Sequence, residues 1–313
     1  MAAPGPGERA YNGLDNAAQL GWRPGKPGMP STTLPFGDKD HPAVVALRER
    51  LRAANGIVGL VRQSPPPPPP SFHLWDAAGR HNILHLSPLQ EVVDGAAVLE
   101  GAPGVAERAA EIFLRDGFVA VENALVGADL ARMQRASDTV VREAMALDPE
   151  RLGNRNSHRY SFGGVSHSGH CMNVAEWVEC LVDNEVCRRI MKHIFNSEDY
   201  ICRGGGGDFC LPGCVEYQNL HQDMGDPIGS ADPTDTPAVT IRDSPPPACT
   251  CNFAMQDLTF ENGPIRQIPQ TQHMRAPGGA FNAPPLETEP EWMRLSTVLV
   301  PAGSVVMRNV LCW

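Results

Sequence analysis

The sequence predicts a mainly β protein with flanking helices, in which a β-sandwich core is buttressed by helical segments. Helical periodicity is confined to the part of the chain before Tyr200. Beyond it, short runs of β-forming residues alternate with Gly and Pro. Several short strands separated by turn signals favour a sandwich or barrel over alternating βαβ units. The 313 residues are enough for one large or two ordinary domains with a substantial core.

Residues 1–104 are expected to form a largely irregular, Pro- and Gly-rich N-terminal extension. The first 40 or so residues show no periodic pattern and are rich in Gly, Pro and polar residues. One short helix is predicted within residues 41–54, HPAVVALRERLRAA, with Asn55 and Gly56 closing it. The six prolines from Pro65 to Pro70 predict an extended polyproline spacer.

The folded domain is expected to span residues 105–313 and to begin with helical segments. AERAAEIFLRDG, residues 106–117, has helical spacing and stops at a glycine, and FVAVENAL, residues 118–125, alternates as a strand. ADLARMQRASDTVVREAMAL, residues 128–147, predicts a longer amphipathic helix. A further helix with a broad apolar face is predicted over residues 175–195.

The β-rich part follows. Its predicted strands are CVEYQNLH (214–221), AVTIRD (238–243), CTCNFAMQDL (249–258), PIRQIP (264–269), STVLV (296–300) and SVVMRNVLCW (304–313).

Composition restricts the partners and the compartment. The formal net charge of −10 argues against nucleic acid or an anionic membrane surface, and no run of about 18 apolar residues predicts a membrane-spanning helix. The N-terminus lacks the basic and apolar regions of a secretory signal. Nine cysteines, an odd number in a long chain, predict reduced thiols and a cytoplasmic or other intracellular protein. Small neutral or anionic ligands stay open as partners, because local charge in a cleft can oppose the net charge, and the oligomeric state is left open.

The stretch YQNLHQDMGDP, residues 217–227, contains the strongest candidate site. His221 and Asp223 are two residues apart, so their side chains point the same way if a strand continues through them. An imidazole and a carboxylate suit a first-row metal, and two His with one carboxylate form the non-heme Fe(II) site of oxygenases. The same spacing also fits a surface His and Asp at a strand end.

The surrounding segments distinguish these interpretations. RYSFG at residues 159–163, GGDFCLPG at 206–213, EYQNLHQD at 216–223, NFAMQDLTFENGPIRQIPQTQH at 252–273 and PAGSVVMRNVLCW at 301–313 occur in the order and at the spacing of a known family. Together they resemble the phytanoyl-CoA dioxygenase family of Fe(II)/2-oxoglutarate-dependent oxygenases. The resemblance covers roughly residues 106–313.

The resemblance implies a double-stranded β-helix, a jelly-roll of the cupin type, with Fe(II) in its mouth. It implies that His221 and Asp223 are metal ligands and catalytic residues, with 2-oxoglutarate as co-substrate and dioxygen as the oxidant. Related halogenases replace the carboxylate ligand by a small residue, so Asp223 favours a hydroxylase of a small organic or acyl substrate. Gln218 and Asn252 match positions that contact 2-oxoglutarate in the family, although each also suits a polar residue at a strand edge.

Three further residues have two interpretations each. His273 either belongs to a loop, as its family position implies, or acts as the second metal histidine. Arg159 and Tyr160 either line a substrate mouth or form an exposed turn.

The sequence departs from the family pattern at its end. In the family, the strand that resembles residues 304–313 leads directly into the second iron histidine, and an arginine that binds 2-oxoglutarate follows it. Both positions would come after Trp313, so little or no 2-oxoglutarate turnover is expected from these 313 residues. Either the sequence is a shortened oxygenase, or it is a catalytically inactive binding or interaction protein with the dioxygenase fold. The first interpretation places the Trp313 backbone within roughly 12 Å of the His221 imidazole.

Overall fold

The structure is a computed structural model that describes part of the chain. The described residues are 72–75, 81–84, 92–151, 158–163, 175–202, 204–212, 214, 220–224, 245–259, 262–273, 283, 293 and 296–313. The predicted helix at 41–54, the polyproline spacer, the strand at 238–243 and Gln218 lie outside them. The chain divides into two compact units, one formed mainly by residues 125–184 and 200–218 and the other by 53–124, 185–199 and 219–313.

A four-stranded mixed sheet forms the centre of the second unit, with strand order β3-β4-β8-β7. β3 (Val92–Asp94) runs parallel to β4 (Phe118–Glu122), and β8 (Val305–Asn309) runs antiparallel to both β4 and β7 (Cys249–Phe253). β4 and β8 are therefore the inner strands, although 182 residues of chain separate the end of β4 at Glu122 from the start of β8 at Val305. The sheet brings together the first predicted strand of the domain and the last.

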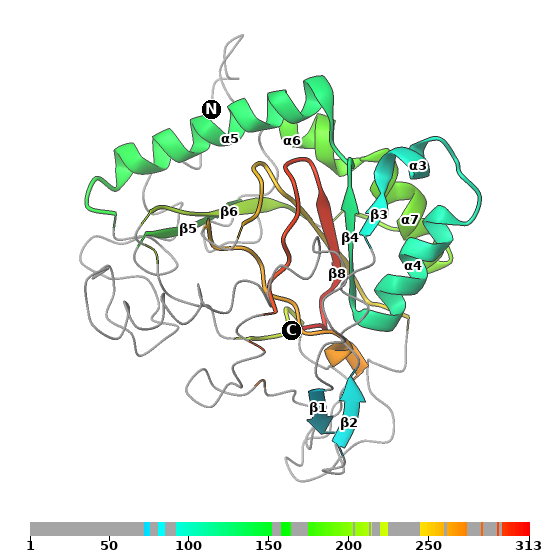
Figure 1. The fold of residues 1–313 in the computed structure, drawn as a ribbon. Helices are drawn as coiled ribbons and strands as arrows, with labels where there is room; N and C mark the ends of the chain where they lie inside the picture. The colour runs from blue at the N-terminus through cyan, green and yellow to red at the C-terminus, as the bar shows by residue number, and fades with distance from the viewer. Residues whose placement is uncertain are drawn as a thin grey trace. The chain divides into compact units, whose positions relative to one another are not determined.

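One face of this sheet packs against helices. α4 (Val105–Asp116) and α7 (Glu185–Phe195) cover it, as Figure 1 shows, and contribute the fully buried Phe113 and Ile190. Alternate residues of the two inner strands point toward them because side chains along a strand alternate between faces. These residues are at most 1 % exposed: Val119, Val121, Val305 and Met307.

The end of α4 explains a glycine in the sequence. Gly117 adopts a left-handed conformation with φ 87°, and its amide donates to the carbonyl of Phe113. The side-chain nitrogen Nε2 of Gln272 donates to the backbone carbonyls of Leu114 and Arg115, both at 3.2 Å. Helix ends leave carbonyls without intrahelical partners, so the short 3-10 turn Thr271–His273 completes α4.

The other unit contains α5 (Gly127–Leu147), α6 (Ala175–Trp177), the π-helical turn η2 (Val178–Val182), β5 (Arg159–Gly163) and β6 (Gly206–Cys210). β5 and β6 form an antiparallel ribbon. The single helix predicted over residues 175–195 is thus three segments. The π-helical turn and the non-helical C-cap at Asp183 end the first part before α7 begins.

Residues before position 105 also have defined structure. β3 pairs with β4, and α3 (Gly95–Leu99) is capped by the side chain of Asp94, which accepts from the amide of Ala96. The closely packed Gly95 leaves no room for a side chain, since a Cβ there would lie 2.5 Å from the carbonyl oxygen of Glu122. The predicted extension therefore contains elements that pack on the core. β1 (Phe72–Trp75) and β2 (His81–Leu84) form a separate antiparallel ribbon.

The described strands establish one mixed sheet and two ribbons, and the complete double-stranded β-helix stays a prediction. No helix in the part of the chain that the structure describes is long and apolar enough to cross a membrane. None of the eight cysteines in the described ranges forms a disulfide.

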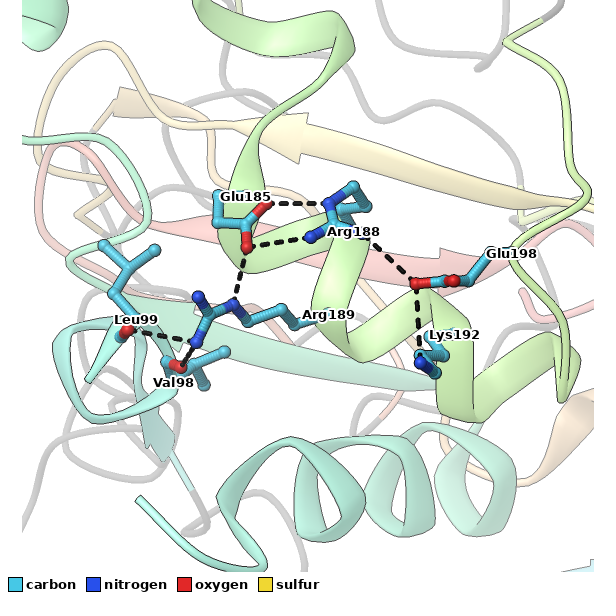
Figure 2. Close-up of polar contacts among 7 residues, drawn as sticks. All are labelled: Val98, Leu99, Glu185, Arg188, Arg189, Lys192 and Glu198. Atoms are coloured by element: carbon cyan, nitrogen blue, oxygen red, sulfur yellow. Dashed lines mark hydrogen bonds and ion pairs between the residues drawn. The ribbon is translucent and has the colours of Figure 1, made fainter. Parts of the chain in front are cut away.

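The start of α7 is fastened to α3 by a network centred on Glu185 (Figure 2). Glu185 accepts from Arg188 Nε at 2.7 Å and from Arg189 Nε at 2.7 Å. Arg189 Nη1 also donates to the carbonyls of Val98 and Leu99, at 2.9 and 3.0 Å. The hydrogen bonds from the two guanidinium groups lower the pKa of the Glu185 carboxyl from 4.5 to about 2.

Glu185→Gln is expected to remove a pH-dependent contribution to stability. The folded-state pKa is depressed, so the contribution is present above about pH 4.5 and is lost as the pH falls toward 2. Because the side chains are partly exposed, the loss at pH 7 should stay below about 1 kcal/mol. Urea unfolding of both proteins at pH 7 and pH 3.5 measures it, with Glu150→Gln at an exposed turn as the control. An equal difference at both pH values would contradict the assignment.

Candidate metal centre

The segment 220–224 carries both predicted metal ligands and lies beside the residues that follow β8. The amide of Asp223 donates to the carbonyl of Val310 at 2.8 Å. Met224 packs against Val310 and Leu311, and Leu220 belongs to one apolar cluster with Trp313. Residues 310–313 therefore lie next to the segment that carries His221 and Asp223.

His221 and Asp223 converge. His221 Nε2 lies 3.3 Å from Asp223 Oδ1, and the two side chains are 49 % and 33 % exposed. Two donor atoms that occupy adjacent positions around an octahedral ion, each about 2.1 Å from the ion, lie about 3 Å from each other. The two donor atoms are therefore close enough for one ion and accessible to it, so this pair fits two positions of a metal site.

A residue that sequence reasoning missed completes the polar cluster. Arg308 extends from the inner strand β8, and its Nη2 lies 2.6 Å from Asp223 Oδ2. Its Nε donates to Asn252 Oδ1 at 3.0 Å. The available signal was a charged residue inside the mainly apolar run VVMRNVL, at the position two after Val306 and therefore on the same sheet face.

The charges around Asp223 keep it ionised. Burial would raise the pKa of its carboxyl, but the hydrogen bond with His221 and the charge of Arg308 outweigh burial. The pKa of Asp223 therefore lies below its ordinary value of 3.8. At neutral pH the carboxylate is an anionic oxygen donor, the form that a hard divalent cation requires.

Of the two residues predicted to contact 2-oxoglutarate, the structure describes one. Asn252 lies on β7, is exposed, and accepts from Arg308, so it belongs to the same polar cluster as Asp223. Gln218 lies outside the described residues. Contact of either side chain with 2-oxoglutarate stays a prediction.

His273 is the last residue of the 3-10 turn Thr271–His273, so it lies neither in an irregular loop nor beside His221 in a cluster of metal-binding side chains within the described residues. Its Nε2 is 3.1 Å from the carbonyl oxygen of Leu114, at the end of α4. Within the described ranges, no three His, Cys, Asp or Glu side chains gather closely enough to hold an ion. His221 and Asp223 are thus joined by no third such ligand from that part of the chain.

Arg159 and Tyr160 form part of the other unit, on β5. Tyr160 is 3 % exposed, donates to Asp148 Oδ2 at 2.6 Å and stacks on Phe209 with ring centroids 4.8 Å apart. Arg159 pairs with Asp208 at 3.8 Å. The interpretation of these two residues as an exposed turn is wrong, because both belong to β5, which pairs with β6, and Tyr160 is buried.

The backbone of Trp313 is held on both sides by the loop that ends at His273. The amide of Ile268 donates to the Trp313 carbonyl at 2.7 Å, and the Trp313 amide donates to Thr271 Oγ1 at 2.8 Å. The same loop caps α4 through Gln272. The motif PIRQIPQTQH therefore positions the chain beside the candidate metal ligands.

Comparison with known protein families gives a match that spans the candidate site. Residues 113–313, more than half of the chain, match the family described as Phytanoyl-CoA dioxygenase (PhyH). The match includes His221, Asp223, Asn252 and Arg308. The curated proteins contain no match to the chain.

Proposed function

The chain belongs to the phytanoyl-CoA dioxygenase family, whose fold is cupin-like, and on that premise we propose that it is an Fe(II)/2-oxoglutarate-dependent oxygenase. We propose His221 and Asp223 as two of its metal ligands. The observation that carries the proposal is the 3.3 Å separation of His221 Nε2 from Asp223 Oδ1 within the matched region.

The residues have separate roles in this proposal. His221 presents the Nε2 lone pair of its neutral imidazole, and Asp223 presents a carboxylate oxygen. Bound Fe(II), with 2-oxoglutarate, supplies the activation of dioxygen that drives substrate oxidation. A carboxylate at position 223 occupies the ligand position that related halogenases leave open, so we propose hydroxylation of a small organic or acyl substrate.

Metal binding tests the proposal directly. The 313-residue chain is titrated with Co(II), a visible ion of the same first-row series, and the His221→Ala variant is titrated in parallel. Loss of a ligand is expected to weaken binding by more than the roughly 10- to 100-fold that loss of an outer-shell partner costs. His193→Ala is the control, because His193 is also partly exposed, at 35 %, and contacts Glu107 on α4. Equal Co(II) affinity in the wild-type and His221→Ala proteins would overturn the proposal.

A second experiment, designed to strengthen metal binding, tests whether the chain that follows β8 delivers a metal ligand. Because Trp313 lies in one cluster with Leu220, a histidine added directly after Trp313 should reach the same ion as His221. We expect this extended protein to bind Co(II) about 10-fold more tightly or better, whereas an added alanine should have no effect. Identical affinities for the two extended proteins would contradict the delivery of a ligand by this strand.

A further inference from the structure

Arg308 joins three segments that are far apart in the sequence. Its backbone lies on β8, opposite Thr250 on β7 and Phe118 on β4. Its guanidinium reaches Asp223 through Nη2 and Asn252 through Nε. The side chain is 16 % exposed, so its charge is largely removed from solvent and its position is set by these two partners.

The two oxygens of Asp223 face different groups. Oδ2 is bound by Arg308 at 2.6 Å, whereas Oδ1 faces His221 Nε2 at 3.3 Å. The amide of Asp223 is also fixed, by its bond to Val310. With the main chain and one oxygen held, rotation of the carboxylate is restricted, and Oδ1 stays on the side of His221.

We propose that Arg308 is a positioning residue of the metal centre, which holds Asp223 so that Oδ1 alone is directed to the ion beside His221. The proposal rests on the proposed function of His221 and Asp223 as metal ligands. Asn252 has a supporting part, since its Oδ1 accepts from Arg308 Nε and so fixes the plane of the guanidinium. Outer-shell hydrogen bonds of this kind orient metal-binding carboxylates in proteins.

If Arg308 instead competed with the metal ion for Asp223, its replacement would raise metal affinity, whereas the loss of a positioning residue would lower it. Arg308 is a cation beside the site, and if it only competed with the ion for Asp223, weakening its hold would strengthen metal binding. Lysine separates the two effects, because it keeps the positive charge but lacks the planar fork that contacts Asp223 and Asn252 together. A drop in affinity in Arg308→Lys thus reports lost positioning.

The test measures Co(II) affinity and the Co(II) absorption spectrum of the full 313-residue chain. Arg308→Lys is expected to weaken binding by about 10- to 100-fold and to alter the spectrum. Asn252→Ala should change both in the same direction by a smaller factor, and because Asn252 is exposed this variant should fold normally. Arg115→Lys is the matched control, since Arg115 binds both oxygens of Asp116, at 2.9 and 2.7 Å, outside the metal centre.

The outcomes separate this inference from the one on which it rests. Positioning by Arg308 is overturned if Arg308→Lys and Asn252→Ala both bind Co(II) as tightly as the wild type, or more tightly, while His221→Ala still loses the ion. That result would leave the proposed function intact. Co(II) binding that His221→Ala does not change overturns the proposed function itself. Thermal unfolding of each variant, compared with Arg115→Lys, shows whether a loss of affinity reflects a loss of fold.

Discussion

Phe113→Ala is expected to lower the free energy of unfolding by about 3–5 kcal/mol, the range for a buried Phe truncated to Ala. Phe113 is fully buried on α4, in the cluster that includes Val121, Ile190 and Met307. Truncation removes most of its apolar surface and leaves a cavity between a helix layer and the inner strands. Natural domains have only about 5–15 kcal/mol of stability, so the loss should be a large fraction of the total.

The next residue supplies the control for this experiment. Leu114 lies on the same helix and is 41 % exposed, so Leu114→Ala should cost well under about 1 kcal/mol. Urea unfolding at constant pH measures both variants. Similar losses in the two would mean that α4 does not pack on the sheet through the face that carries Phe113.

Gly117→Ala is expected to cost about 2–4 kcal/mol for two separate reasons. The left-handed conformation, with φ 87°, is unfavourable for a residue with a Cβ by about 1–2 kcal/mol. A Cβ at this position would also lie 2.4 Å from Gln272 Oε1 and 2.7 Å from Cys312 Sγ, both on buried residues. Moving Gln272 weakens its bonds to the last carbonyls of α4, and a buried acceptor without a partner costs a further 1–3 kcal/mol or so.

Gly127→Ala isolates the conformational part of this cost. Gly127 also has a positive φ, 57°, but a Cβ there would meet nothing within 4 Å. Thermal or urea unfolding should therefore show a clearly smaller loss for Gly127→Ala than for Gly117→Ala. Equal losses would mean that the contact with Gln272 and Cys312 contributes nothing.

Hydrophobic periodicity and a helix-ending glycine, which are local features of the sequence, predicted several helices and strands correctly. The helices at α4 and α5 and the strands at β4, β7 and β8 follow from periodicity and from Gly117, and all are present. The break before α7 was missed because the apolar face continues across it, and periodicity does not register a π-helical turn. β3 was missed because three residues are too few for a periodic pattern.

The candidate site was predictable only in part. His221 and Asp223 are two residues apart, and this short spacing is consistent with the convergence of their side chains. The pairing of Asp223 with Arg308 joins positions 85 residues apart, and the segment that carries Asp223 is held beside the end of β8 by the bond from the Asp223 amide to the Val310 carbonyl. The contact of His273 with the end of α4 is similarly non-local, and spacing alone left its role open.

The loop from Ile268 to His273 binds the end of α4 and the backbone of Trp313 at the same time. Ordering a residue costs about 1–2 kcal/mol in backbone entropy, whenever it happens. Hydrogen bonds within the protein, from this segment to α4 and to Trp313, already order the backbone here. Metal binding therefore does not have to order the chain beside His221. The amides of Ile268 and Trp313 should then exchange with solvent as slowly as those of the core strands, and metal binding should leave their protection unchanged.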